Sequence, residues 1–327
     1  MKAVVLRAHG GTEVLQFEDI PALVPGDYDI VVTVHATALN RADLLQRMGL
    51  YPNPFPDEYD IPGLEYAGVV AQIGAKVSAW KVGDRVMGIV AGGAYAEQVC
   101  VHERQAMPVP THLTLSDAAA IPEVFLTAWD ALVLQGGLTS GRWALVHAGA
   151  SGVGSAAIQI CRAIGARIAV TCSTGKVQAC RDMGADVVID YTTQDFVEEI
   201  KKCTDQRGVD VVLDVIGGDY LDRNIASLAL KGRIIQVGTM AGKSVPFNVG
   251  ALLPKRATIT GTVLRPRPLE EKIALTQLFI SELLPLFETE QLAPLIDSCY
   301  AFSDIAAAHE YMASNANVGK IVVEIAE

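Results

Sequence analysis

The pattern of apolar residues changes near the middle of the chain. From Lys2 to about Pro110, short β-rich segments are separated by Gly and Pro, a pattern typical of a compact, barrel-like β domain. After Arg142, apolar strand segments alternate with helical segments, which predicts a parallel, doubly wound sheet. Beyond Leu264 the pattern predicts a loop, an amphipathic helix and a last strand in GKIVVEIAE. The fold class is therefore predicted to be α/β.

These two sequence patterns predict two domains, and the second is inserted into the first. A chain of 327 residues is long enough for about two hydrophobic cores. The boundary falls within 116–137, where Pro122 separates two short helical pieces. We expect residues 1–122 to form the first part of the β-rich domain, 123–264 the α/β domain, and 265–327 a return to the first.

A cluster of glycines in the α/β region carries the clearest functional signal. An apolar run from Trp143 to Ala148 predicts a buried strand, and a helical pattern begins after Gly149, Gly152 and Gly154. Such glycines let the backbone approach a diphosphate, whose charge meets the free amides of the helix start. The spacing is not GxGxxG, so the cluster alone fits a plain tight turn equally well. The surrounding strand–helix alternation favours the nucleotide site.

Charge and cysteine usage argue against several classes of function. The net charge is −11, so the overall field favours neither nucleic acid nor an anionic membrane. The six cysteines form no CxxC pair and no cluster with zinc spacing, and we expect them to be reduced. The apolar run before Arg7 is too short for a signal peptide, and no run is long enough for a membrane helix. We therefore expect a cytoplasmic protein.

Several separated segments carry motifs of one known family: NRADLLQRMGLY (40–51), PGLEYAGVV (62–70), KVGDRVMG (81–88), AAAIPEVFLTAW (118–129), HAGASGVG (147–154) and NVGKIVVEI (317–325). In this order they resemble the medium-chain dehydrogenase/reductase family, and within it the NADPH-dependent quinone oxidoreductase, zeta-crystallin-like branch. The resemblance implies a GroES-like catalytic domain built from both chain ends. It also implies a Rossmann cofactor domain, with the active site in the cleft between the two domains.

The chain departs from the zinc-dependent members of this family. Those relatives bind a catalytic metal through Cys and His, whereas Leu64 stands where a GHE-type motif would have His, and 40–43 offers no Cys. The six histidines are scattered, so each is expected in the core or at the surface. We predict no zinc, which favours reduction of an already activated acceptor over alcohol oxidation. Glu65 receives no clear role.

The resemblance implies four catalytic residues: Asn40, Asp43, Tyr51 and Ser151. Asn40 and Asp43 share one side of a helical turn and would line the nicotinamide and substrate cleft, although Asn40 equally fits a helix N-cap. The Tyr51 phenol would hydrogen-bond a quinone oxygen or relay a proton, with Tyr59 as the nearby competitor, and anchoring the proline-rich loop is the alternative. Ser151 fits a helix cap, a contact with the nicotinamide end of the cofactor, or both.

The choice of cofactor follows from the second strand of the α/β region. NAD sites usually place Asp or Glu at its end, whereas this strand ends in TCSTGK. An acid about 4 Å from a phosphate would cost about 4 kcal/mol at an effective dielectric of about 20, and Lys176 attracts instead. NADPH is therefore predicted, with Ser173, Lys176 and Tyr191 as candidate contacts of the 2′-phosphate. The predicted cofactor set is Asn40, Thr127, Gly149, Ser151, Gly152, Val153, Gly154, Ser173, Lys176, Tyr191, Gly238, Thr239, Met240, Leu264, Arg265 and Lys320.

The predicted function is zinc-independent, NADPH-dependent hydride transfer to a small-molecule quinone or activated enone. An enoyl-thioester reductase of the same fold stays open, as does a low-activity NADPH-binding protein of the crystallin or RNA-interacting type. The resemblance implies Thr127, Lys320 and Arg265 as cofactor contacts. By themselves Lys320 and Arg265 fit ordinary solvated charges. The apolar segment KSVPFNVGALLPKRATITG predicts a homodimer or homotetramer. We expect no nucleic-acid or membrane partner.

Overall fold

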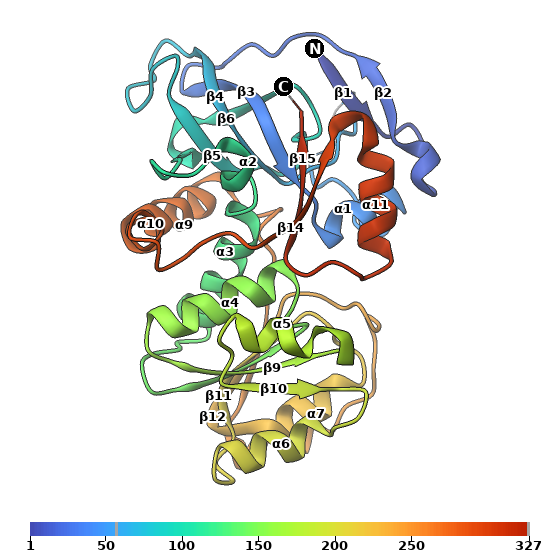
Figure 1. Ribbon diagram of the computed structural model, residues 1–327, viewed down its shortest axis with the longest axis vertical. Helices are drawn as coiled ribbons and strands as arrows, with labels where there is room; N and C mark the ends of the chain where they lie inside the picture. Colours follow the sequence, from blue (N-terminus) through green and yellow to red (C-terminus); the bar gives the residue numbers. More distant parts are fainter. Residues whose placement is uncertain (56–57, 326–327) are drawn as a thin grey trace. The chain divides into compact units, whose positions relative to one another are not determined.

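The computed structural model describes residues 1–55 and 58–325, which divide into two compact units. Unit 1 contains Met1–Glu123 and Leu264–Glu327, and unit 2 contains Val124–Val263. The chain therefore leaves unit 1 once, builds the whole of unit 2, and returns (Figure 1).

Unit 1 is organised around a seven-stranded sheet in the order β14-β15-β3-β4-β5-β7, with β6 also paired to β3. The last strand, β15, pairs antiparallel with β3 through Val322 and Ala38, so the end of the chain completes a sheet begun by its start. Buried side chains of its strands, among them Ile30, Val32 and Tyr66, form a hydrophobic core. A separate two-stranded sheet joins β1 and β2. The strands are β1 (Lys2–Val5), β2 (Gln16–Asp19), β3 (Asp29–Ala38), β4 (Glu65–Ile73), β5 (Arg85–Ile89), β6 (Gln98–His102), β7 (Met107–Pro108), β14 (Ile296–Ala301) and β15 (Lys320–Glu324).

Short helices connect these strands. The proline-rich loop forms no helix or strand over 51–55 and 58–63, as its prolines predict, and residues 56–57 lie outside the described part of the chain. The amphipathic helix predicted after Leu264 is α9, which the short α10 follows. The helices of unit 1 are α1 (Arg41–Arg47), α2 (Leu115–Ala118), α9 (Leu269–Glu282), α10 (Leu284–Glu288) and α11 (Ile305–Ala313). Helix α3 (Pro122–Trp129) crosses the boundary between the units.

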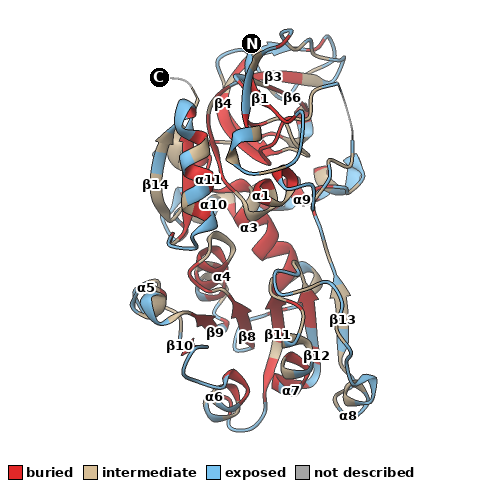
Figure 2. Cartoon of the chain, turned by 90° about the vertical axis from the view of Figure 1, so that its right-hand side faces the viewer, coloured by how far each residue is buried: buried red, intermediate tan, exposed pale blue. Residues whose placement is uncertain are grey.

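Unit 2 is a six-stranded parallel sheet in the order β10-β9-β8-β11-β12-β13. Helices α4 and α5 lie on one face of this sheet and α6 and α7 on the other (Figure 1). The central strands are buried, whereas β13 at the edge is largely accessible (Figure 2). The predicted doubly wound sheet is confirmed. Its elements are β8 (Trp143–His147), β9 (Arg167–Cys172), β10 (Val187–Asp190), β11 (Val209–Asp214), β12 (Leu228–Gln236), β13 (Thr258–Gly261), α4 (Gly152–Ala163), α5 (Val177–Asp182), α6 (Phe196–Cys203), α7 (Tyr220–Ser227) and α8 (Leu252–Lys255).

Candidate active site

Asn40 stands between β3 and α1, at the end of a strand and the start of a helix. Its backbone amide donates to the Asp43 carboxylate at 2.7 Å, which satisfies one amide of the helix start. Its side chain turns to other partners: Nδ2 donates to Glu65 Oε1 at 2.8 Å and to the Ala38 carbonyl at 3.2 Å. Both Nδ2 protons are thereby engaged, so the remaining capacity of this amide lies on Oδ1.

Lys320, the first residue of β15, points into the same network. Its Nζ donates to Glu65 Oε1 at 2.7 Å, to Asn40 Oδ1 at 2.8 Å and to the Leu39 carbonyl at 2.7 Å. The side chains of Lys320 and Glu65 are only 3% and 0% exposed, so the interpretation of Lys320 as a solvated charge is wrong. An ammonium group has three protons, and all three have partners here. In this conformation Lys320 fixes Asn40 in position.

The carboxylate of Glu65 binds the other members of this hydrogen-bond network. It begins β4 and is fully buried. While Oε1 accepts from Asn40 and Lys320, Oε2 accepts the backbone amide of Glu123 at 2.8 Å. Sequence reasoning gave Glu65 no clear role, although a charged residue inside the apolar run LEYAGVV is itself a signal, since buried carboxylates need partners.

Asp43 is fully buried one turn into α1. Its Oδ2 accepts from the hydroxyl of Tyr95 at 3.1 Å, and that hydroxyl lies 3.1 Å from Nε2 of His309 on α11. Burial raises the pKa of Asp43 to about 6, against the Asn40 amide, Lys320 and Tyr95, which favour its charged form. Burial, with a smaller contribution from Arg47, lowers the pKa of His309 to about 3. This chain of polar groups ties α1 to α11.

Tyr51 and Arg265 form a second, adjoining group in unit 1. The Arg265 guanidinium lies 5.2 Å from the centre of the Tyr51 ring, and its Nη1 donates to the Tyr51 carbonyl at 3.2 Å. Nη2 donates to Gln46 Oε1 at 2.8 Å, and Nε donates to the Ala91 carbonyl. Arg265 is 5% exposed, so it is not the solvated charge that its sequence alone suggested. Burial and the neighbouring acid Glu123 raise the pKa of Tyr51, which keeps its hydroxyl protonated at neutral pH.

Glu123 adjoins this candidate site, and sequence reasoning did not single it out. It is the second residue of α3 and is partly exposed. Burial raises its pKa to about 8, and the charges of Glu65 and Asp43 act in the same direction, opposed by Lys320 and Arg265. The sequence does contain a signal for Glu123, because it is an acid directly after Pro122 in the otherwise apolar run AAAIPEVFLTAW.

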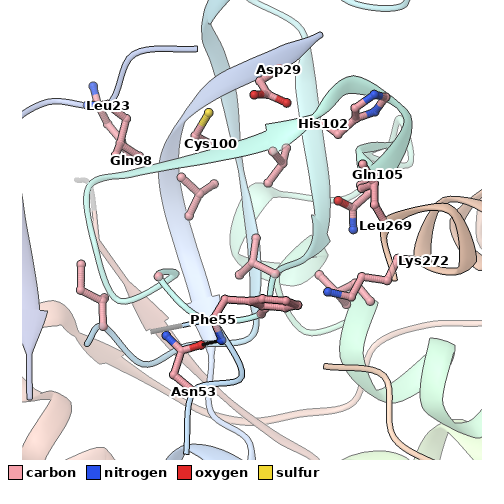
Figure 3. A pocket seen from close by; sticks show the side chains of 18 of the residues that line it. Leu23, Asp29, Asn53, Phe55, Gln98, Cys100, His102, Gln105, Leu269 and Lys272 are labelled. Atoms are coloured by element: carbon pink, nitrogen blue, oxygen red, sulfur yellow. Dashed lines mark hydrogen bonds between the residues drawn. The ribbon is translucent and has the colours of Figure 1, made fainter. Parts of the chain in front are cut away.

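An open pocket of about 650 Å³ also lies in unit 1, beside the proline-rich loop (Figure 3). Asn53 and Phe55 border it from the loop, and the Nζ of Lys272 lies 5.3 Å from the centre of the Phe55 ring. Much of its lining is apolar, with Val99 and Val101 among the residues contributed by β6. Tyr51 and Asn40 are not among its lining residues.

In unit 2 the glycine turn joins β8 to α4. A Cβ added at Gly149 would lie 2.5 Å from Val170 of β9, and one added at Gly154 would lie 2.5 Å from the Ala148 carbonyl oxygen, so side chains are excluded at both positions. Ser151 caps the helix, since its Oγ accepts the Gly154 amide at 3.1 Å. The next amides, those of Gly152 and Val153, donate to no group within the described part of the chain. The start of α4 therefore presents open donors.

The three residues predicted at the 2′-phosphate lie at neighbouring strand ends. Ser173 and Lys176 follow β9, and the Tyr191 amide after β10 donates to the Cys172 carbonyl at 3.1 Å. Sequence reasoning overlooked Asp190, which ends β10. Its Oδ1 accepts from the Thr192 amide at 3.0 Å, and hydrogen bonds from threonine hydroxyls hold its pKa below the usual range. A charged acid therefore lies beside the predicted phosphate contacts.

The remaining predicted cofactor contacts lie in three places. Gly238, Thr239 and Met240 follow β12 and run beside the end of β11, where the Met240 amide donates to the Val215 carbonyl at 3.3 Å. Thr127 lies on α3 and is buried. Leu264 is a buried residue of unit 1, next to Arg265.

A buried polar chain supports the ends of β8, β9 and β11. Asn224 Nδ2 donates to Asp214 Oδ2 at 2.9 Å, so the Asn224 oxygen faces His147 Nε2 at 2.7 Å. His147 must donate from Nε2, and its Nδ1 then accepts from the Thr171 hydroxyl at 3.0 Å. One carboxylate thus sets the tautomer of His147, the last residue of the strand that leads into the glycine turn.

The described residues contain neither a metal-binding cluster nor a membrane-spanning helix. Within 1–55 and 58–325, no group of three or more His, Cys, Asp or Glu side chains is arranged to hold a metal ion. Over the same residues, no helix has the length and apolar character that crossing a bilayer requires.

Comparison with known proteins gives matches to both parts of the chain. Residues 26–111 match the family of alcohol dehydrogenase GroES-like domains, and 152–279 match the zinc-binding dehydrogenase family. The human synaptic vesicle membrane protein VAT-1 homolog is 33% identical over 340 residues, which cover 99% of this chain and 86% of that protein. Human quinone oxidoreductase is 31% identical over 313 residues, 95% of this chain and 93% of that protein.

A solved structure extends this similarity to the whole fold. The crystal structure of Escherichia coli quinone oxidoreductase complexed with NADPH aligns with a TM-score of 0.88 at 29% identity, over 99% of this chain and 100% of that one. The chain belongs to the medium-chain dehydrogenase/reductase family of oxidoreductases, in its quinone oxidoreductase, zeta-crystallin-like branch.

Proposed function

We propose that this protein uses NADPH to reduce quinones or activated enones. The observation that carries the proposal is the start of α4, where two glycines exclude side chains and the amides of Gly152 and Val153 remain open. The relatives named as quinone oxidoreductases, one of them solved with NADPH, support the choice of acceptor and cofactor.

Unit 2 has the groups that a dinucleotide requires. Gly149, Gly152, Val153 and Gly154 would hold the diphosphate, and Ser151 can donate its own proton while its Oγ accepts the Gly154 amide. Ser173, Lys176 and Tyr191 would hold the 2′-phosphate. Thr127, Leu264 and the segment 238–240 would line the rest of the cofactor. When bound, the reduced nicotinamide supplies the hydride.

Unit 1 supplies the groups that orient the acceptor. Glu65 and Lys320 hold Asn40, and we expect its side-chain amide to contact a ligand beside the Lys320 ammonium group. Arg265 holds Tyr51, whose protonated hydroxyl can donate to a carbonyl oxygen of the acceptor. No metal is required for an acceptor that receives hydride readily.

A panel of acceptors tests the proposal. Purified protein is mixed with NADPH or NADH and with a naphthoquinone, a cyclic enone or an enoyl-CoA thioester, while fluorescence titration measures cofactor binding. We expect oxidation of NADPH with the quinone or the enone, and weaker use of NADH. Turnover confined to the thioester would replace the proposal by an enoyl-thioester reductase. Tight NADPH binding without turnover of any acceptor would favour a binding protein.

A further inference from the structure

Three carboxyl groups gather around Asn40, and only one of them reaches the surface. Asp43 and Glu65 are fully buried, and each accepts hydrogen bonds. Glu123 is partly exposed, and no hydrogen bond to its carboxyl group occurs among the described residues. We propose that the Glu123 carboxyl group is the proton donor to the reduced acceptor; this inference rests on the function proposed above.

The fold brings Glu123 to Asn40 through a shared partner. Pro122 begins α3 and has no amide proton, so the first amide that this helix offers is that of Glu123. This amide donates to Oε2 of Glu65, whose Oε1 accepts from the Asn40 side chain at 2.8 Å. Asn40 and the backbone of Glu123 are therefore anchored to the two oxygens of one carboxylate, so a group bound at Asn40 would lie near the start of α3. The Glu123 carboxyl group itself lies near enough to Glu65 and Asp43 for their charges to act on it.

The surrounding charges favour the protonated form of this acid. Glu65 and Asp43 disfavour a further negative charge, and the nearby cations have other partners: Lys320 is bound to Glu65, and Arg265 to Gln46 and Tyr51. Burial together with these carboxylates accounts for a pKa of Glu123 of about 8. Lys272 also lies near enough for Glu123 to influence its pKa. An acid whose pKa lies near the working pH transfers protons efficiently.

The proposed step balances atoms and electrons. The acceptor gains a hydride, with its two electrons, from NADPH, and it gains a proton as the O–H bond of Glu123 breaks. For a quinone the proton goes to the reduced oxygen, and for an enone to the carbon next to the carbonyl. Glu65 and Asp43 destabilise the resulting carboxylate. It takes a proton from water, since the Glu123 residue is partly exposed. Glu123 lies near enough to Tyr51 to raise the pKa of the Tyr51 phenol, so Tyr51 can relay the proton from Glu123 to the acceptor.

The variant Glu123→Gln keeps the size of the side chain and removes the acid, whereas Glu123→Asp keeps an acid. Glu282→Gln, at an exposed position of α9, is the matched control. Infrared difference spectra of wild type minus Glu123→Gln should show a protonated carboxyl band that disappears with a midpoint near pH 8. This readout requires no turnover, and the affinity for NADPH should be equal in all variants.

The pH dependence of kcat with a naphthoquinone gives the functional readout. Wild-type and Glu282→Gln activity should fall as the pH rises through the pKa of Glu123. Glu123→Gln should be slower by at least about 100-fold and lack this decline, and Glu123→Asp should recover part of both. Wild-type kcat and pH profile in Glu123→Gln would overturn this inference and leave the proposed function intact. An absence of turnover by the wild type with every acceptor would overturn both, and an infrared band that titrates near pH 4 would overturn this inference alone.

Discussion

The ammonium group of Lys320 lies 2.7 Å from the carboxylate of Glu65, although the two residues are 255 positions apart in the sequence. The pair is buried and is completed by hydrogen bonds to Asn40 and to the Leu39 carbonyl. It connects the last strand of unit 1 to β4 and to Asn40, the residue just before α1. The position of Asn40 therefore depends on the end of the chain.

Removing the cation alone should be costly. Lys320→Met leaves Glu65 as a buried charge without its counterion, and we expect the free energy of unfolding in urea to fall by about 3–5 kcal/mol. The double variant Lys320→Met/Glu65→Gln should recover part of this loss. Lys81→Met, at an exposed position of the same unit, should change stability by less than about 0.5 kcal/mol. Equal stability of Lys320→Met and the wild type would contradict the role assigned to the pair.

The pair also shows where sequence reasoning reaches its limit. Local periodicity predicted the β-rich and α/β regions because the apolar pattern of a strand or helix depends on neighbouring residues. The burial of Lys320 depends instead on the pairing of β15 with β3, which brings together residues from opposite ends of the chain. The sequence shows Glu65 and Glu123 as charges within apolar runs. It does not show that the Glu65 carboxylate binds Asn40, Lys320 and the Glu123 amide. Asp190 was overlooked although Tyr191, the next residue, was predicted as a phosphate contact, because an acid was sought only at the end of the second strand.

Cofactor preference should depend on Lys176. If its ammonium group meets the 2′-phosphate, Lys176→Ala should weaken NADPH binding about tenfold and leave NADH binding nearly unchanged. Asp190→Asn removes the nearby negative charge and should shift the same ratio of dissociation constants in the opposite direction, toward NADPH. Lys202→Ala, on the exposed side of α6, serves as the control. Equal effects of Lys176→Ala on the two cofactors, measured by fluorescence titration, would remove the electrostatic argument.

The His147 chain should make unit 2 sensitive to acid. Burial lowers the pKa of His147, so the folded protein binds this proton less readily than the unfolded chain does. The contribution to stability is therefore present above the unfolded pKa of about 6.5 and is lost as the pH falls below it. His147→Gln should show a shallower loss of unfolding free energy between pH 7 and 5 than the wild type. At neutral pH, the ¹⁵N spectrum of His147 should show the proton on Nε2; a proton on Nδ1 would contradict the hydrogen-bond assignment.

Self-association is expected at the β13 edge of unit 2. The segment before this strand exposes large apolar side chains, and Leu253 on α8 is 76% exposed. Light scattering should give the mass of a homodimer or homotetramer, and Leu253→Glu should lower it. Val24→Glu is the control, since Val24 is also highly exposed, at 83%, but lies in unit 1. A monomeric mass for the wild type would end this expectation.

Transfer of a labelled hydride tests the proposed function most directly. Two samples of NADPH, each deuterated on one face of the reactive nicotinamide carbon, are incubated separately with the protein and a cyclic enone. Mass spectrometry then locates the label in the saturated product. We expect one of the two cofactors, and not the other, to deliver a single deuterium to the carbon β to the carbonyl. A product without deuterium from either cofactor would contradict the account, and so would the absence of NADPH oxidation with both the enone and a naphthoquinone.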